Sequence, residues 1–193
     1  MLALDHDGVQ PDLVCLSKTL SGGMVPVGAV VGRSTIFDRV FDSVERSVVH
    51  SPTFRENPLA MAVGLASLHA IEAEDLVAQA RVRGRRLFDR LGEVATRVPG
   101  IREVRGRGLM IGIELDPSTL AFDLPGYGSR TPTLVAQAVV GWMLKEHRVL
   151  VQSTAKSSAA VKVVPPLVLS DDDVDWFAEA LAETLRELSR GRA

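Results

Sequence analysis

Residues 11–23 read PDLVCLSKTLSGG, and this stretch decides how the chain begins to fold. The apolar run Leu13–Leu16 is typical of a short buried strand. It leads directly into a loop rich in Ser, Thr and Gly, which carries Lys18. A second apolar run, Val27–Val31, predicts another buried strand. The stretch therefore predicts two strands joined by a loop that has a lysine at its start.

Lys18 is the residue of this loop with the clearest chemical potential. A strand that delivers its amine to the edge of a sheet would leave that amine partly desolvated, and desolvation lowers the pKa of a lysine. The neutral amine is a nucleophile toward carbonyl compounds. The alternative, an ordinary surface lysine in a loop, stays open on spacing alone because lysine is common there.

A second candidate is the pair of hydroxyls in Ser51-Pro52-Thr53, just ahead of Asn57-Pro58. Asn at the N-cap and Pro at the first helical position predict a helix that starts there and runs to about residue 72. The N-terminus of a helix presents free N–H groups and suits a phosphate. Ser51 and Thr53 are therefore candidate phosphate ligands, and local capping by Thr53 and Asn57 is the alternative.

The pattern of the chain changes after this helix. Residues 1–72 read as the end of a parallel α/β part, in which Ser34 caps a short helix through Val40, and residues 73–193 read as an α+β part. In the second part the periodicity first predicts a helix from Leu76 to before Pro99, and then a hairpin of strands Ile101–Val104 and Met110–Leu115 with a turn through Gly106 and Gly108. An irregular stretch over residues 116–132 follows. The rest of the chain predicts a helix over 133–147, strands over 149–152 and 161–164, and a last helix over 171–189 that is capped by Ser170 with Asp173.

Composition excludes several classes of protein. The chain has 193 residues and a net charge of −2, without the basic excess that a nucleic-acid or anionic-membrane partner requires. One cysteine, Cys15, excludes a scaffold stapled by disulfides. No apolar stretch approaches a membrane span, and no signal peptide is visible, so we expect a soluble cytoplasmic protein. The four histidines show no ligand spacing, so no metal site is expected.

Taken together, four ordered motifs closely resemble class III aminotransferases. Residues 11–23, with PVGAV at 26–30, resemble the lysine motif of that family, and HSPTFRENPLA at 50–60 resembles its phosphate segment. VRGRGLMIGIEL at 104–115 resembles the hairpin that opens its small domain, and VPPLVL at 164–169 resembles its end. The resemblance implies the aspartate-aminotransferase-like fold (fold type I): the C-terminal part of the α/β large domain at 1–72, followed by the α+β small domain at 73–193.

The resemblance also implies a cofactor and roles for four residues. Lys18 would bind the aldehyde of pyridoxal 5'-phosphate (PLP) and move the alpha proton of the substrate. Thr53, with Ser51 beside it, would reach the phosphate of the cofactor in the partner subunit of a homodimer. Lys162 stands where the family usually has an arginine for a substrate carboxylate, and lysine lacks the bidentate fork of arginine. The expected reaction is amino transfer from an amino acid or amine to a keto acid or aldehyde.

One departure limits these expectations. The family carries its pyridine-nitrogen aspartate, its ring-stacking aromatic residue and its main phosphate loop upstream of the lysine motif, and the sequence resembles the C-terminal half alone. We therefore expect the isolated chain to be inactive and prone to self-association. The alternatives are an aminomutase or racemase on the same scaffold, or a non-catalytic fragment or interaction subunit.

Overall fold

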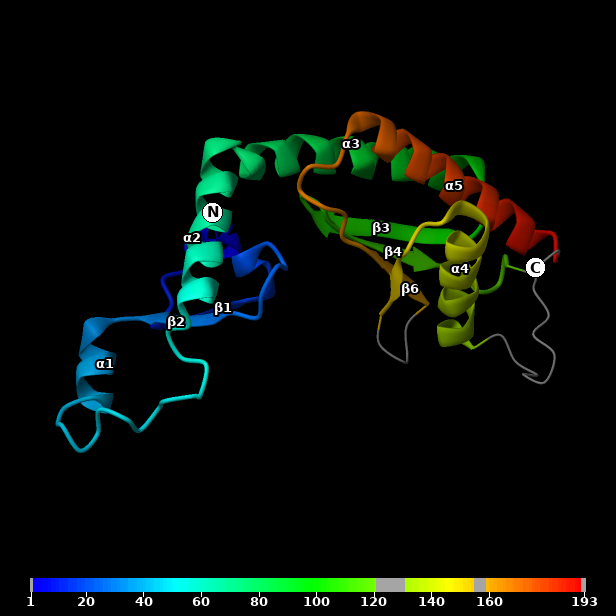
Figure 1. Ribbon diagram of the computed structural model, residues 1–193. Coiled ribbons are helices and arrows are strands. Elements are labelled where there is room, and N and C mark those ends of the chain that lie inside the picture. Colours follow the sequence, from blue (N-terminus) through cyan, green and yellow to red (C-terminus); the bar gives the residue numbers. More distant parts are fainter. Residues whose placement is uncertain (1, 121–130, 155–158, 192–193) are drawn as a thin grey trace. The chain divides into compact units, whose positions relative to one another are not determined.

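A computed structural model of the chain describes residues 2–120, 131–154 and 159–191. The chain forms two compact units, Met1–Val77 and Ala78–Ala193, called here the first and the second unit (Figure 1). The elements of the first unit are the 3-10 turns η1 (Ala3–His6) and η2 (Lys18–Ser21), the strands β1 (Leu13–Ser17) and β2 (Gly28–Gly32), and the helices α1 (Ser34–Val40) and α2 (Pro58–Ala73).

The two strands of the first unit pair antiparallel, with Leu13 opposite Gly32 and Ser17 opposite Gly28. The expected parallel arrangement is wrong for these strands. Their connection holds only the η2 turn, whereas a parallel return needs a longer crossover. The expected burial is also wrong, since Leu13, Val30 and Val31 are 49%, 51% and 56% exposed. One face of this sheet, which carries Leu13, Cys15 and Ser17 of β1, is exposed.

Helix α2 begins as predicted and supports the lysine loop. The Asn57 side chain accepts a hydrogen bond from the Ala60 N–H at 3.2 Å, and Pro58 occupies the first turn. Two turns further on, Gly64 is buried, and η2 packs against the helix there. A Cβ at Gly64 would lie 3.7 Å from the Leu20 carbonyl oxygen, so a small residue lets the loop approach the helix closely.

The start of α1 differs from the sequence prediction. Arg33 occupies the N-cap position, and Ser34 is the first residue of the helix instead of its cap. No side chain caps this helix, and the Arg33 guanidinium instead pairs with Asp12 at 3.0 Å. The predicted extent of the helix, through Val40, is confirmed.

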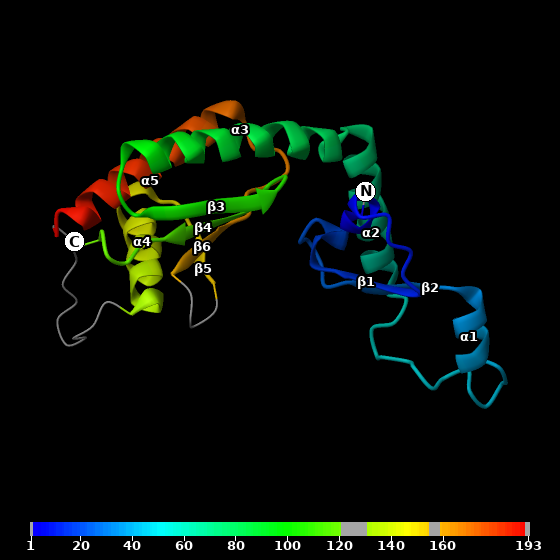
Figure 2. The same ribbon diagram turned by 180° about the vertical axis from the view of Figure 1, so that it is seen from behind.

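The second unit is a two-layer structure of one antiparallel sheet and three helices (Figure 2). The sheet has the order β3-β4-β6-β5, and every neighbouring pair is antiparallel. The expected α+β architecture is confirmed. The elements are α3 (Leu76–Arg97), which begins at the boundary of the units, β3 (Ile101–Arg107), β4 (Met110–Leu115), α4 (Pro132–His147), β5 (Gln152–Ser153), β6 (Ala160–Val163) and α5 (Asp171–Ser189).

Two predictions for the second unit differ from the structure, in the hairpin turn and in the strand that follows α4. Gly106 lies inside β3, opposite Ile111, so the hairpin turn is only Gly108-Leu109. Gly108 has φ +56, a conformation that glycine adopts readily at the start of a two-residue turn. The strand expected over 149–152 is shorter and later, at Gln152–Ser153. Part of the irregular stretch expected over 116–132, residues 121–130, lies outside the described residues.

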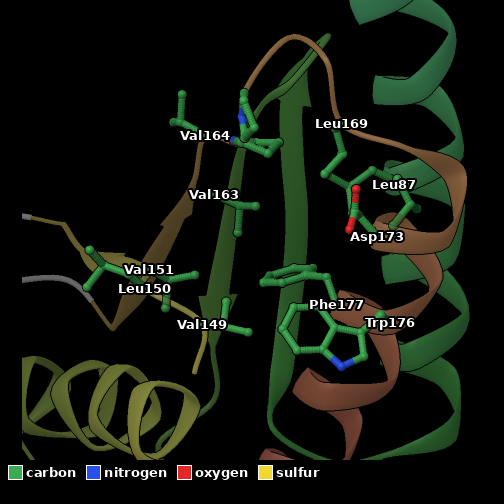
Figure 3. Close-up of a pocket in the computed structure, with 13 residues that line it drawn as sticks. Leu87, Val149, Leu150, Val151, Val163, Val164, Leu169, Asp173, Trp176 and Phe177 are labelled. Atoms are coloured by element: carbon green, nitrogen blue, oxygen red, sulfur yellow. The ribbon is translucent and has the colours of Figure 1, made fainter. Parts of the chain in front are cut away.

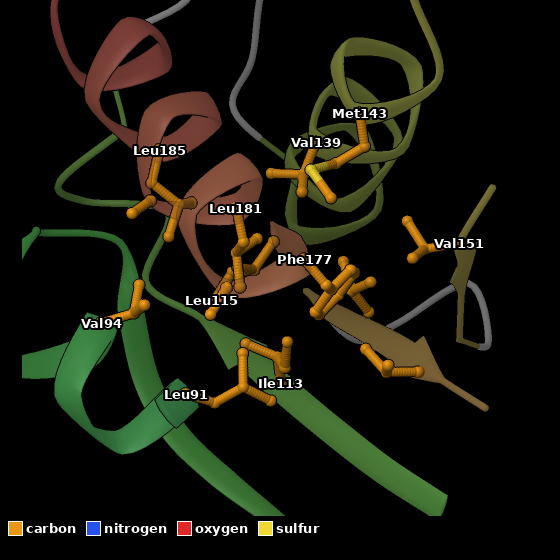
Figure 4. Close-up of a cluster of buried hydrophobic side chains, with 14 of the residues drawn as sticks. Leu91, Val94, Ile113, Leu115, Val139, Met143, Val151, Phe177, Leu181 and Leu185 are labelled. Atoms are coloured by element: carbon orange, nitrogen blue, oxygen red, sulfur yellow. The ribbon is translucent and has the colours of Figure 1, made fainter. Parts of the chain in front are cut away.

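The hydrophobic core of the second unit fills the space between the sheet and its helices (Figure 4). Alternate residues of β4 and β6 point into this core, and the other face of the sheet carries Lys162 and Glu114 together with Met110, Gly112 and Ala160. The fully buried members include Leu91 and Val94 of α3, Ile113 and Leu115 of β4, Val139 and Met143 of α4, and Leu181 and Leu185 of α5.

Helices α3 and α5 are also joined by a network of ion pairs at the surface. Glu179 of α5 accepts from the guanidinium of Arg97 at 2.8 Å and from that of Arg90 at 3.1 Å. Arg90 also pairs with Asp175 at 2.9 Å. The hydrogen bond from Arg97 lowers the pKa of Glu179 below its usual value. The Glu179 side chain is 49% exposed, so solvent screens much of this attraction.

This network predicts a small acid sensitivity. Because the pKa of Glu179 is lower in the folded chain than in the unfolded one, its contribution to stability is complete above the usual carboxyl range and is lost as the pH falls from that range through the lowered pKa of the folded state. We expect Glu179→Gln to cost up to about 1 kcal/mol of unfolding free energy at neutral pH and less near pH 3. Urea denaturation at both pH values measures this, with Glu183→Gln on the same helix as control. Equal costs at both pH values would contradict the prediction.

Candidate functional site

Lys18 lies where β1 ends and η2 begins, and its backbone is unusual. Its φ is +56, in the left-handed region, which residues other than glycine rarely adopt. A lysine gains nothing locally from that conformation, and such strain concentrates at functional sites. Among the described residues, no hydrogen bond or ion pair engages its amine. The side chain is exposed, so the expected partial burial of this amine is not found in this chain.

The loop that follows Lys18 is held by a residue that sequence reasoning missed. Ser21 is 1% exposed, and its hydroxyl donates to the Val25 carbonyl oxygen at 2.5 Å. Gly22 and Gly23 follow with φ +62 and +81, which closes the turn. Ser21 thus fixes the shape of the loop that carries Lys18. Its only signal in the sequence is a serine before two glycines, which is also typical of ordinary turns.

Ser51 and Thr53 lie in the segment between α1 and α2, and both are exposed. Asn57 alone provides the side-chain cap of α2, so the interpretation of Thr53 as a capping residue is wrong. Within the described part of the chain, neither hydroxyl is engaged in a hydrogen bond. Both therefore remain available to a ligand.

The structure does not bring these hydroxyls beside the lysine of the same chain. Residues 41–57 run from the start of α2 toward α1, while η2 packs further along α2 (Figures 1 and 2). The contact of η2 at Gly64 lies seven residues beyond Asn57, or about 10 Å along the helix axis. No hydrogen bond between described residues joins Lys18 to Ser51 or Thr53.

Lys162 belongs to the second unit, on the face of the sheet opposite the helices. It is exposed, while Val161 and Val163 on either side of it are buried in the core. In the sheet it is paired with Gly112 of β4 and with Gln152 of β5. Its ammonium forms no ion pair with any residue that the structure describes. Lys162, which the sequence predicts as a carboxylate ligand, therefore presents a cation without an ion-pair partner among the described residues on the exposed surface of the sheet.

Arg105 is the neighbouring cation on this surface, and its charge is engaged. Its guanidinium pairs with Glu103 at 3.1 Å and with Glu114 at 3.0 Å. The hydrogen bond to Glu114 raises the pKa of Arg105, so this side chain stays ionised throughout the physiological range. Of the two cations beside Gly112, Lys162 is therefore the one without an ion-pair partner among the described residues.

An apolar pocket of about 360 Å³ lies elsewhere in the second unit, between the end of β6 and the first turns of α5 (Figure 3). Trp176 and Phe177 line one side, and Val149, Leu150 and Val151 line the other. Asp173 is the one charged residue among those that line it, and its carboxylate is bound by the hydroxyl and the N–H of Ser170. The hydrogen bonds from Ser170 lower the pKa of Asp173. This pocket therefore offers apolar contact but no free reactive group.

The described ranges contain neither a cluster of metal ligands nor a membrane-spanning helix. Among residues 2–120, 131–154 and 159–191, no three His, Cys, Asp or Glu side chains are grouped so that they could hold a metal ion. In the same ranges, no helix has the length and the apolar character needed to cross a membrane.

Comparisons with known proteins identify relatives over almost the whole chain. The model of the family described as aminotransferase class-III matches residues 1–185. The aminotransferase PigE of Serratia sp. (strain ATCC 39006) is 31% identical over 222 residues, a match that covers 98% of this chain and 26% of that protein.

Solved structures match equally widely. The ornithine aminotransferase of Toxoplasma gondii, solved with partial occupancy of PLP at its active site, is 31% identical with a TM-score of 0.79 over 99% of this chain and 40% of that one. The acetylornithine aminotransferase of Elizabethkingia anophelis is 30% identical with a TM-score of 0.76, over 96% of this chain and 43% of that one. The chain thus spans about a quarter of the curated relative and about two fifths of these structures.

Proposed function

Because the chain belongs to the class III aminotransferase family, we propose that it is the lysine-bearing part of a PLP-dependent enzyme that transfers an amino group from an amino acid or amine to a keto acid or aldehyde. Residues 1–72 would be the C-terminal part of the PLP-binding large domain, and residues 73–193 the small domain. The observation that carries the proposal is Lys18, a free amine held in a left-handed backbone at the end of a strand.

The residues present fit the cofactor of this family. Class III aminotransferases depend on PLP, which needs an amine for its aldehyde and donors for its phosphate. Lys18 offers the amine, and its neighbours Ser21, Gly22 and Gly23 fix the loop that presents it. Ser51 and Thr53 offer hydroxyls that Asn57 leaves free. When bound, PLP withdraws electrons from the carbon that carries the amino group and makes its proton acidic.

The chain's own residues then have distinct tasks. In its neutral form, the Lys18 amine accepts the proton of the substrate's alpha carbon, and as an ammonium group it returns a proton. Ser51 and Thr53 donate hydrogen bonds to a phosphate. Residues 41–57 lead away from the lysine loop of their own chain, which supports assigning the phosphate they bind to the partner subunit of a homodimer. Lys162 attracts the carboxylate of the substrate as a point charge.

The setting of the enzyme is proposed on the same basis. The substrates are small molecules, and the net charge of −2 provides no basic excess for a nucleic acid. A single cysteine, Cys15, is consistent with a reducing compartment, so we place the enzyme in the cytoplasm.

Amino transfer itself is the decisive measurement. The enzyme that contains this chain, supplied with PLP, is expected to convert a keto acid into the corresponding amino acid at the expense of an added amino donor. Mass spectrometry with a ¹⁵N-labelled donor follows the nitrogen. Label in the acceptor supports the proposal, whereas racemisation or migration of the amino group within one molecule would identify a racemase or aminomutase instead.

Thr53 provides a separate prediction about the cofactor. Thr53→Ala is expected to raise the dissociation constant for PLP about tenfold, because a hydrogen bond to a charged phosphate is lost. Absorbance titration of the apoenzyme with PLP measures this constant. Thr35→Ala, which removes an exposed hydroxyl from α1, is the matched control and should leave the constant unchanged. Equal constants for both variants would place the phosphate elsewhere.

A further inference from the structure

A row of four residues crosses the open face of the second unit's sheet. Lys162 of β6 lies opposite Gln152 of β5 on one side and opposite Gly112 of β4 on the other. Gly112 in turn lies opposite Arg105 of β3. Residues directly opposite each other in antiparallel strands send their side chains to the same face, with Cβ atoms about 5 Å apart. Gln152 and Lys162 are therefore neighbours on an exposed surface.

The polar groups in this row differ in whether they are already engaged. Arg105 binds two carboxylates, Glu103 of its own strand β3 and Glu114 of β4. Glu114, the acidic residue of β4 nearest to Lys162 in register, is thereby held by another cation. Neither the amide of Gln152 nor the ammonium of Lys162 has a hydrogen-bond or ion-pair partner within the described residues. The two free groups are thus the two that stand side by side.

Gly112 keeps the space beside Lys162 open. A Cβ at this position would lie 3.8 Å from the carbonyl oxygen of Arg105 and 3.9 Å from its Cγ, so the site tolerates a side chain but has none. Any larger residue there would stand between Lys162 and Arg105 on the same face. Without it, a small anion can reach the ammonium over the β4 backbone.

We propose that Gln152 and Lys162 together bind the carboxylate of the substrate. This inference rests on the proposed function and adds to it a residue that determines specificity. Lysine supplies a point charge without fixed direction, whereas arginine supplies two parallel N–H donors. The side-chain amide of Gln152 donates the second hydrogen bond to the same carboxylate. The pair thus does with two side chains what a single guanidinium does, and it selects donors that carry a carboxylate.

A protection experiment tests the pair without any turnover. Trinitrobenzenesulfonate modifies the free lysines of the holoenzyme, and peptide mass spectrometry reads the modification of each one. Propanoate, which has a carboxylate and no amino group, is expected to protect Lys162 and to leave Lys145 unprotected. Gln152→Leu is expected to raise the concentration for half-protection about tenfold, since one hydrogen bond to a charged group is lost. Gln137→Leu, an exposed glutamine of α4, is the matched control.

Steady-state kinetics provide a second test of the pair. L-alanine and 2-aminopropane differ in having a carboxylate or a methyl group, and Gln152→Leu is expected to lower kcat/KM about tenfold for alanine only. In a Lys162→Arg background the same change should cost less than threefold, because the guanidinium supplies both donors. An equal loss for both donors, or no protection of Lys162 by propanoate, would overturn the pair. Protection without any amino transfer would leave the pair standing and reject the proposed function.

Discussion

Lys18→Gly is expected to lower amino transfer at least about a thousandfold while leaving the fold intact. The loss follows because the chain then has no amine to bind the cofactor or to move the alpha proton. Proton transfer by a positioned group alone accelerates a reaction by a factor of about 10²–10⁴. The fold is kept because φ at this position is +56, which glycine adopts without the penalty of about 1 kcal/mol or more that other residues incur. We therefore expect the unfolding free energy to stay the same or to rise by up to about 1 kcal/mol.

Steady-state kinetics and urea denaturation of the same preparations measure the two effects. Arg148→Gly is the matched control, because Arg148 has φ +59 as the left-handed C-cap of α4 and lies in the other unit. It should show the same small gain in stability with normal activity. Borohydride reduction with bound PLP, followed by peptide mapping, should label Lys18. Label on Lys145 or Lys162 instead, or full activity in Lys18→Gly, would contradict the assignment.

The parts of the fold that were predicted correctly depend on sequence patterns whose residues lie within a few positions of each other. Asn57 followed by Pro58, and Ser170 followed by Asp173, each specify a helix start through hydrogen bonds within one turn, and the structure has both. The direction and burial of β1 and β2 were wrong, because these properties depend on which strands and helices lie alongside. An apolar run such as Leu13–Leu16 has the same pattern in a parallel and in an antiparallel sheet.

In the candidate site, too, the features encoded by nearby residues are visible in the sequence, and those that depend on distant parts of the chain are not. Motifs point to Lys18, Thr53 and Lys162 from the sequence alone, since each stands in a recognisable local pattern. The left-handed backbone of Lys18 has no such signal, because the residues that adopt it are normally glycine or asparagine. Gln152, which we propose as a carboxylate ligand, has no signal in the sequence for another reason. Its pairing with Lys162 joins strands separated by residues 154–159, and the register between strands is not visible before the sheet is known.

The largest expected effect on stability comes from Gly84, where α3 passes over the hairpin turn of the sheet that carries Lys162. A Cβ at Gly84 would overlap both the carbonyl carbon and the carbonyl oxygen of Gly108. That backbone cannot yield easily, because Gly108 begins a two-residue turn that is closed by the pair of Arg107 and Met110. An added methyl group must therefore push the helix away from the sheet and weaken the core beneath it.

Gly84→Ala is accordingly expected to cost about 3 kcal/mol of unfolding free energy, at the upper end of the usual cost of overpacking. Gly92→Ala, two turns later in α3, has no atom within 4 Å of the new Cβ. It should instead stabilise the chain by up to about 1 kcal/mol, because alanine favours the helix over glycine. Urea denaturation followed by the fluorescence of Trp142 and Trp176, both in the second unit, measures this difference. Equal stability of the two variants would mean that α3 does not rest on the turn, and the sheet face that presents Lys162 and Gln152 would then need another support.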